Sequence, residues 1–187
     1  MRVTGGSLKG RELAAPKGRA VRPTSGKVRE SIFSVIGPRI AGSRVLDLFC
    51  GVGTLGIEAM SRGAREAVFL ETSPAALKFL ERNLSTLGIR DVAKVIKSDC
   101  RSFLRSKAPC REFDLVFADP PYSLKCGREI VELLEEQDIL CPGALVVFEH
   151  SRFEDLPDRT GKLLLAKRRR FGDSVFSIYE ASAKEGK

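Results

Sequence analysis

The sequence predicts an α/β fold built on a doubly wound, mostly parallel sheet with an antiparallel C-terminal hairpin. From residue 44 onward, short apolar runs alternate with segments of helical periodicity, and strands that alternate with helices form parallel sheets. Near the end, the strand-like segments 163–171 and 175–181 flank Gly172-Asp173, a dipeptide typical of hairpin turns. Together these observations indicate a Rossmann-like domain.

Local signals justify the elements one by one. A small hairpin is expected over 3–15, and a helix that opens at 23 ends at 36 because Gly37-Pro38 follows. The glycine-rich turn 51–56 opens a second helix to Arg62, and leucines at helical spacing mark a third over 74–87. The remaining elements are expected as strands over 44–49, 67–70, 92–96, 113–118 and 144–149, and a helix over 128–134.

Length and composition narrow the class of protein. The 187 residues suit one domain, expected over 23–181, with an N-terminal arm over 1–22 and a polar tail over 182–187. No apolar run approaches about 18 residues and no apolar signal core opens the chain, so we expect no membrane contact. Five scattered cysteines and the lone His150 disfavour disulfides and a metal site. A cytoplasmic protein without a metal ion is the expectation.

The excess positive charge lies in the first quarter of the chain. Residues 1–45 hold ten Lys and Arg against two Asp and Glu, and the remainder holds 22 of each sign. Such a block attracts a polyanion, and the interleaved glycines let the backbone approach phosphates. This pattern favours a nucleic-acid-docking arm over a merely solubilising surface. A second cluster, 167–170, fits an RNA contact and a solvated hairpin face equally well.

Acidic residues follow three successive strands of the predicted sheet, where open α/β sheets bind their ligands. Asp47 precedes the glycine-rich loop, where its charge would repel a pyrophosphate and attract an ammonium group. S-adenosylmethionine offers that ammonium and no phosphate. Glu71 is then expected to bind its ribose hydroxyls and Asp99 its adenine amino group. The predicted cofactor-binding residues are Asp47, Phe49, Gly51, Gly53, Glu71, Asp99 and Cys100.

The run Asp119-Pro120-Pro121-Tyr122 follows the fourth strand of the sheet and is the predicted catalytic loop. Methylating an exocyclic amine requires hydrogen-bond acceptors for both of its N–H groups. The side chain of Asp119 and the carbonyl of Pro120 can accept them, and the two prolines hold the loop rigid. Tyr122 offers a flat face on which an extruded base can stack. Catalysis would then rest mainly on alignment of the amine with the methyl group.

Several stretches resemble the RsmD family of bacterial 16S rRNA (guanine(966)-N2)-methyltransferases, over about residues 1–181. The resemblance implies a class I S-adenosylmethionine-dependent fold and transfer of a methyl group to a guanine N2 amine. It further implies a 30S ribosomal subunit, or a late assembly intermediate, as substrate, and an arm that grips rRNA. We expect RNA contacts from Arg2, Lys9, Arg11, Arg22, Thr24 and Arg29, and a monomer. The matching stretches are 22–24, 28–30, 46–64, 119–122 and 172–180.

Other functions remain open at this point. The catalytic run also occurs in DNA adenine-N6 methyltransferases, although this chain has no separate domain for reading a DNA sequence. A non-catalytic RNA-binding assembly factor would need the basic arm but would not need Asp47, Glu71, Asp99 or the run 119–122. A nicotinamide-dependent oxidoreductase would use a similar glycine loop, but Asp47 disfavours it.

Overall fold

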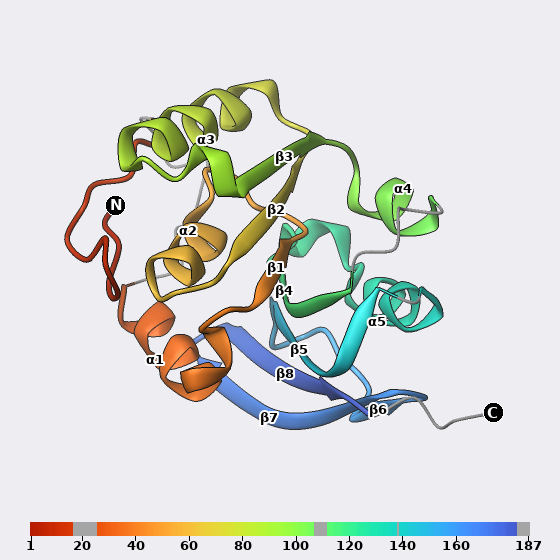
Figure 1. Ribbon diagram of the computed structural model, residues 1–187. Coiled ribbons are helices and arrows are strands. Elements are labelled where there is room, and N and C mark those ends of the chain that lie inside the picture. The colour runs from red at the N-terminus through yellow and green to blue at the C-terminus, as the bar shows by residue number, and fades with distance from the viewer. Residues whose placement is uncertain (17–25, 107–111, 138, 183–187) are drawn as a thin grey trace.

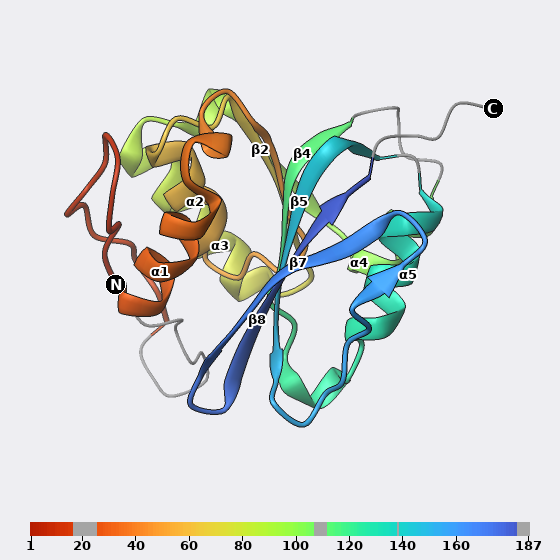
Figure 2. The same ribbon diagram turned by 90° about the horizontal axis from the view of Figure 1, so that it is seen from below.

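One mixed sheet runs through the molecule, with helices on both of its faces (Figures 1 and 2). The computed structural model describes residues 1–16, 26–106, 112–137 and 139–182. Helices α1, α2 and α3 cover one face, and α4 and α5 cover the other (Figure 2). Their bounds are Gly26–Ile36, Thr54–Ser61, Pro74–Leu87, Cys100–Arg105 and Gly127–Glu136. Short 3-10 helices span Gly37–Ile40 (η1), Arg90–Val92 (η2) and Tyr122–Leu124 (η3).

The sheet has the predicted mixed topology. Its order is β3-β2-β1-β4-β5-β8-β7-β6, in which β1 to β5 are parallel and β6 to β8 pair antiparallel. The chain order reverses between β1 and β4, so their carboxyl ends open a crevice there. The strands span Arg44–Asp47, Glu66–Glu71, Ala93–Lys97, Phe113–Ala118, Leu140–Ser151, Arg159–Thr160, Leu163–Phe171 and Ser174–Ala181.

Two apolar layers hold the helices to the sheet. Alternate strand residues point to opposite faces, so Phe117 packs beside Phe33 of α1 while its neighbour Val116 joins the layer under α4 and α5. Val3 and Leu13 of the N-terminal segment are 3% and 4% exposed and belong to the first layer. The basic segment before α1 is therefore packed into the main core along part of its length.

The N-terminal hairpin is looser than expected. One antiparallel bridge joins Arg2 to Glu12, and the amide of Val3 donates to the carbonyl of Arg11 at 3.0 Å. Within residues 1–16 these contacts form no continuous strands, and residues 17–22 lie outside the described ranges. We call residues 1–16 the N-terminal arm. None of the described helices has the length and apolar character needed to cross a membrane.

Candidate active site

A cavity of about 520 Å³ opens at the carboxyl ends of the central strands. It brings together residues as far apart in the sequence as Met1 and Glu149, at the crevice where the chain order reverses. Gly53 is the predicted cofactor residue that does not line it. The predicted residues that do are Asp47, Phe49, Gly51, Glu71, Asp99, Cys100, Asp119, Pro120, Pro121 and Tyr122.

Asp47 ends β1 as a buried carboxyl group facing this cavity. It is 1% exposed, and its Oδ2 accepts a hydrogen bond from the amide of Gly56 at 3.0 Å. Burial raises the pKa of Asp47 to about 7, although the backbone amides of Gly56 and Phe49 act in the opposite direction. A buried carboxylate favours a cationic ligand, which would offset its lost hydration.

Glycines shape the loop between β1 and α2. Gly53 has φ of 90°, and a Cβ there would come within 2.5 Å of the Leu80 side chain. Gly56 packs so tightly that a Cβ would lie 2.3 Å from the Phe69 ring. Gly53 therefore contributes a left-handed turn and a close helix contact rather than a surface of the cavity.

Glu71 and Asp99 mark the ends of the next two strands. Oε2 of Glu71 accepts from the amide of Gly51 at 2.9 Å, and Oε1 accepts from the amides of Thr72 and Ser73 at 2.8 Å. Oδ1 of Asp99 accepts from the first amides of α4 and caps that helix. Burial raises the pKa of the Cys100 thiol to about 12, so this side chain is a neutral wall of the cavity.

The loop after β4 is fixed to two other strands through Tyr122. The Tyr122 hydroxyl lies 2.5 Å from Oγ of Ser174 and donates to Oε1 of Glu149 at 3.1 Å. Burial is the main cause that raises the pKa of Tyr122 to about 12, so this residue is a neutral phenol near pH 7. Neither partner is predicted by the sequence. Glu149 could have been found, because it too lies near the carboxyl end of a parallel strand.

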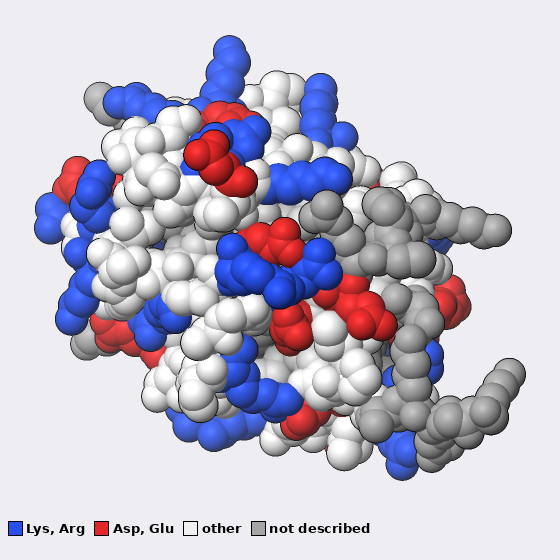
Figure 3. All heavy atoms as spheres, in the orientation of Figure 1, with Lys and Arg blue, Asp and Glu red and all other residues white. Residues whose placement is uncertain are grey.

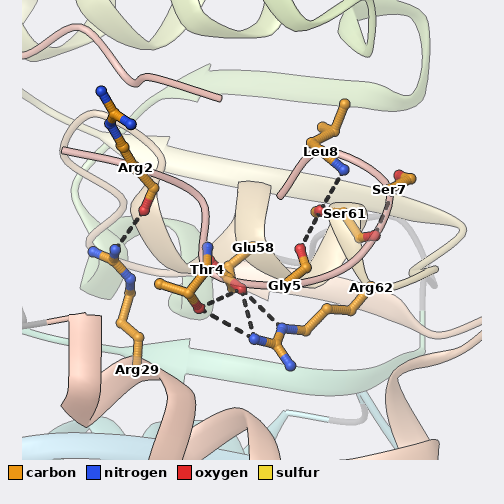
Figure 4. Close-up of polar contacts among 9 residues, drawn as sticks. All are labelled: Arg2, Thr4, Gly5, Ser7, Leu8, Arg29, Glu58, Ser61 and Arg62. Atoms are coloured by element: carbon orange, nitrogen blue, oxygen red, sulfur yellow. Dashed lines mark hydrogen bonds and ion pairs between the residues drawn. The ribbon is translucent and has the colours of Figure 1, made fainter. Parts of the chain in front are cut away.

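The N-terminal arm is fixed to α2 by a buried acid that the sequence analysis also missed (Figure 4). Glu58 is 1% exposed, and its two carboxylate oxygens accept from the amide and hydroxyl of Thr4, each at 2.8 Å. Arg62, one helical turn later, donates to Glu58 at 2.8 Å and to the Thr4 hydroxyl at 3.1 Å. Both oxygens of Glu58 are therefore used to hold the arm.

Ser61 at the end of α2 makes the second attachment of the arm (Figure 4). Its hydroxyl accepts from the amide of Leu8 at 2.9 Å, and its carbonyl accepts from the amide of Ser7 at 2.7 Å. Gly6 has φ of 78°, and a Cβ there would lie 1.8 Å from the Ser61 carbonyl oxygen. Only glycine fits this close approach.

The candidate RNA-binding residues fall into three groups. Arg2, Lys9 and Arg11 are exposed on the arm, although Arg2 pairs with Glu12. Arg29 is 3% exposed and donates to the carbonyl of Arg2 at 2.6 Å, so it supports the arm from inside. Arg22 and Thr24 lie outside the described residues.

Neither His150 nor the acids of the cavity form a metal-binding group. No cluster of three or more His, Cys, Asp or Glu with suitable geometry occurs in the described ranges. His150 is buried, and its Nε2 lies 2.9 Å from the Ser177 hydroxyl. Burial lowers the pKa of His150, consistent with a neutral structural residue.

A sheet of this order, with its ligand cavity at the switch point, is the fold of class I methyltransferases. One solved RNA methyltransferase, from Salinibacter ruber in complex with S-adenosyl-L-homocysteine, is 17% identical and superposes with a TM-score of 0.64. That comparison covers 88% of this chain and 96% of the other, and it shows the shared fold.

Comparisons at higher identity define the family. The family model described as conserved hypothetical protein 95 matches residues 1–180. YlbH of Bacillus subtilis is 40% identical over 182 residues, covering 96% of this chain and 98% of that protein. Ribosomal RNA small subunit methyltransferase D of Escherichia coli is 34% identical over 184 residues, which cover 98% of this chain and 91% of that protein. The solved structure of yhhF from Escherichia coli is 34% identical and superposes with a TM-score of 0.88. That comparison covers 98% of this chain and 99% of the other. The chain therefore belongs to this family, the RsmD family.

Proposed function

We propose that this protein is an S-adenosylmethionine-dependent methyltransferase that modifies the exocyclic N2 amine of a guanine in 16S rRNA. Its substrate would be the assembled or nearly assembled 30S particle. The observation that carries the proposal is the single cavity in which Asp47, Glu71 and Asp99 meet the catalytic loop 119–122. A family relative with rRNA methyltransferase in its name supports the choice of RNA.

The cavity fits this cofactor in charge and position. Asp47 would bind the ammonium group, whose positive charge offsets the cost of a buried carboxylate. Glu71 would receive the ribose hydroxyls with oxygens that already hold the loop at Gly51, and Asp99 would accept from the adenine amino group. When bound, the cofactor supplies an electrophilic methyl group on a sulfonium sulfur.

The catalytic loop would orient the acceptor amine. Asp119 and the Pro120 carbonyl accept hydrogen bonds from the two N–H groups, which aims the nitrogen lone pair at the methyl carbon. The nitrogen lone pair would form the new N–C bond while the C–S bond breaks, and the electron pair of the broken C–S bond would stay on sulfur. The proton then leaves the nitrogen for Asp119 or water. Tyr122 stacks on the extruded base, and its hydroxyl contacts with Ser174 and Glu149 fix the orientation of the ring.

We further propose that the protein acts as a monomer. An rRNA substrate would also be met in the bacterial cytoplasm. The exposed part of the arm, with Lys9 and Arg11, would contact phosphates of the particle.

The decisive test is methyl transfer from labelled S-adenosylmethionine to under-methylated small subunits, with free 16S rRNA and duplex DNA assayed in parallel. Nucleoside analysis is expected to find N2-methylguanosine in the particle. Label in DNA as N6-methyladenine would overturn the substrate while keeping the chemistry. Cofactor binding absent by titration, with RNA binding retained, would instead favour an assembly factor without catalysis.

A further inference from the structure

We propose that the outer edge of β7 and the turn after β5 form a second RNA-binding surface, distinct from the N-terminal arm. This hairpin surface consists of Arg152, Phe153, Lys167, Arg169 and Arg170. It would bind the RNA strand that flanks the target nucleotide. The proposal rests on the proposed function, since it needs an RNA substrate at the catalytic loop, and it adds where that RNA is held.

The hairpin surface begins next to the catalytic loop. Ser174, whose hydroxyl meets that of Tyr122, is the first residue of β8 and pairs with Ser151 at the end of β5. The amide of Arg152 then donates to the carbonyl of Asp173 in the β7–β8 turn at 2.9 Å. Figure 2 shows this turn projecting from the same edge of the sheet as the loops after β4 and β5. RNA that reaches Tyr122 would therefore pass the turn.

Lys167 to Arg170 present four consecutive basic residues, all exposed. Arg168 is paired with Asp158 at 3.1 Å and is left out of the surface. Among the described residues, no carboxylate forms an ion pair with Lys167, Arg169 or Arg170. Arg169 donates to the Ser31 hydroxyl and Arg170 to the carbonyl of Gly172, neutral partners that hold the side chains without cancelling their charge. Three cations are thus available to phosphates.

Phe153 gives the surface a means to bind bases as well as phosphates. Its side chain is the most exposed of the large apolar residues described, at 80%. The Arg152 guanidinium lies over its ring, 4.5 Å from the centroid, and Arg152 is itself held by an ion pair with Asp173. An isolated exposed aromatic is ordinary, but this ring lies under a guanidinium whose residue bonds to the turn beside the catalytic loop, and it can stack on a base of the bound RNA.

Protection of a sheet edge is the simplest alternative explanation for the basic run. β6 pairs with β7 only at Leu163 and Leu164, so the later part of β7 has no described strand on its outer side. Charged side chains on such an edge prevent another strand from adding to it. This explanation accounts for Lys167 to Arg170 but not for Phe153, because an exposed aromatic residue promotes association at an edge.

The charges are tested with Lys167→Ser combined with Arg170→Ser, and with binding measured directly rather than through catalysis. The probes are protein-free 16S rRNA and purified small subunits, titrated from about 50 to about 200 mM salt. We expect affinity for both probes to fall roughly tenfold and the salt slope to fall by about two. The matched control is Lys94→Ser with Lys97→Ser, two exposed bases on β3 at the opposite edge of the sheet, and it should bind as the wild type does.

The ring is tested with Phe153→Ala, for which we expect a fivefold or greater rise in KM for small subunits, on the order of one lost base stack, with an unchanged salt slope. Phe153→Tyr keeps the flat ring and should restore the wild-type KM. Affinity for S-adenosylmethionine and the melting temperature should stay unchanged in all these variants. A structural role for Phe153 would move the melting temperature instead.

Wild-type RNA affinity in the β7 variant would overturn the proposal and leave edge protection as the explanation. An effect seen with small subunits but not with protein-free rRNA would also overturn it, because the surface would then contact a ribosomal protein. Failure of the proposed function is distinguishable, since the wild-type protein would transfer no methyl group while the binding comparison could still be made.

Discussion

At the scale of single residues, Asp47 carries the clearest electrostatic prediction. Burial raises the pKa of Asp47 from its ordinary value of 3.8 to about 7 in the folded protein. Between these two pH values the folded state therefore holds a proton on Asp47 that the unfolded state has lost. The contribution of Asp47 to stability is therefore fully present below pH 3.8 and is lost as the pH rises through 7. At pH 8 we expect Asp47→Asn to raise the free energy of unfolding by roughly 1–4 kcal/mol, with little change near pH 4.

The same variant should weaken S-adenosylmethionine binding at least tenfold, since its amide carries no charge for the ammonium group. Wild-type affinity should also fall as the pH drops from 8 to 6 and Asp47 takes up a proton. Denaturant unfolding at pH 8 and pH 4 measures the effect on stability. Calorimetric titration at pH 8 and pH 6 measures the effect on cofactor affinity. A variant that is less stable at pH 8, or that still binds the cofactor normally, would contradict this role.

Tyr122 is expected to act through its ring and its neutral hydroxyl. Tyr122→Phe keeps the stacking face and loses the contacts with Ser174 and Glu149, so kcat should fall about tenfold with cofactor affinity unchanged. The pKa near 12 implies that the wild-type rate shows no inflection from Tyr122 between pH 8 and 10. An inflection that vanishes in Tyr122→Phe would show a phenolate acting in the reaction.

At the scale of elements, the attachment of the N-terminal arm to α2 depends on one buried charge. Glu58→Ala removes the acceptor for Thr4 and leaves Arg62, 23% exposed, without its acid, so unfolding should become easier by roughly 2–4 kcal/mol. Hydrogen exchange at the amides of Val3 and Leu13 should accelerate. Glu12→Ala is the matched control: its ion pair is 72% exposed on the Glu12 side and contributes little. Unchanged exchange in Glu58→Ala would show that other contacts suffice.

The elements that sequence reasoning placed correctly have signals within a few residues. Helix α3 spans the predicted 74–87, because Ser73 caps it, Pro74 begins it and Gly88 ends it at φ of 70°. Helix α4 is not predicted from the sequence, because six residues are too few for a periodic pattern. Asp99, expected as a cofactor ligand, also caps this helix. Strand β5 begins at Leu140 instead of the predicted 144, where a register shift beside Phe113 accommodates Pro142.

The residues that line the candidate site follow from the sequence where one rule applies repeatedly, and they do not where distant segments meet. Acids at the carboxyl ends of parallel strands identify the cavity, because all those ends share one edge of the sheet. The contact between Tyr122 and Ser174 spans 52 residues, and that between Thr4 and Glu58 spans 54. No local pattern encodes such pairs. The burial of Arg29 under the arm follows from the same long-range packing.

At the scale of the whole molecule, Figure 3 shows basic residues spread over this face, among them residues on the side that carries the N-terminal arm and at the lower edge near β7. The excess of Lys and Arg in residues 1–45 equals the net charge of +8, so this first quarter of the chain dominates the long-range field. The arm is also fixed to α2, and Met1 reaches the wall of the cavity. The exposed bases of the arm are thus held in a set position relative to the cavity.

Lys9→Glu combined with Arg11→Glu should therefore raise KM for small subunits more than tenfold and reduce its dependence on salt, because exposed phosphate contacts become repulsive. Affinity for S-adenosylmethionine should not change, since neither side chain lines the cavity. Arg29→Ala should behave differently and destabilise the fold, because its guanidinium is buried and holds the Arg2 carbonyl. Steady-state kinetics at two salt concentrations would detect the loss of an RNA contact at Lys9 and Arg11. Thermal unfolding in parallel would detect the loss of the structural role of Arg29. Equal effects of the two changes on both measurements would mean that the arm acts in RNA binding only through its folded shape.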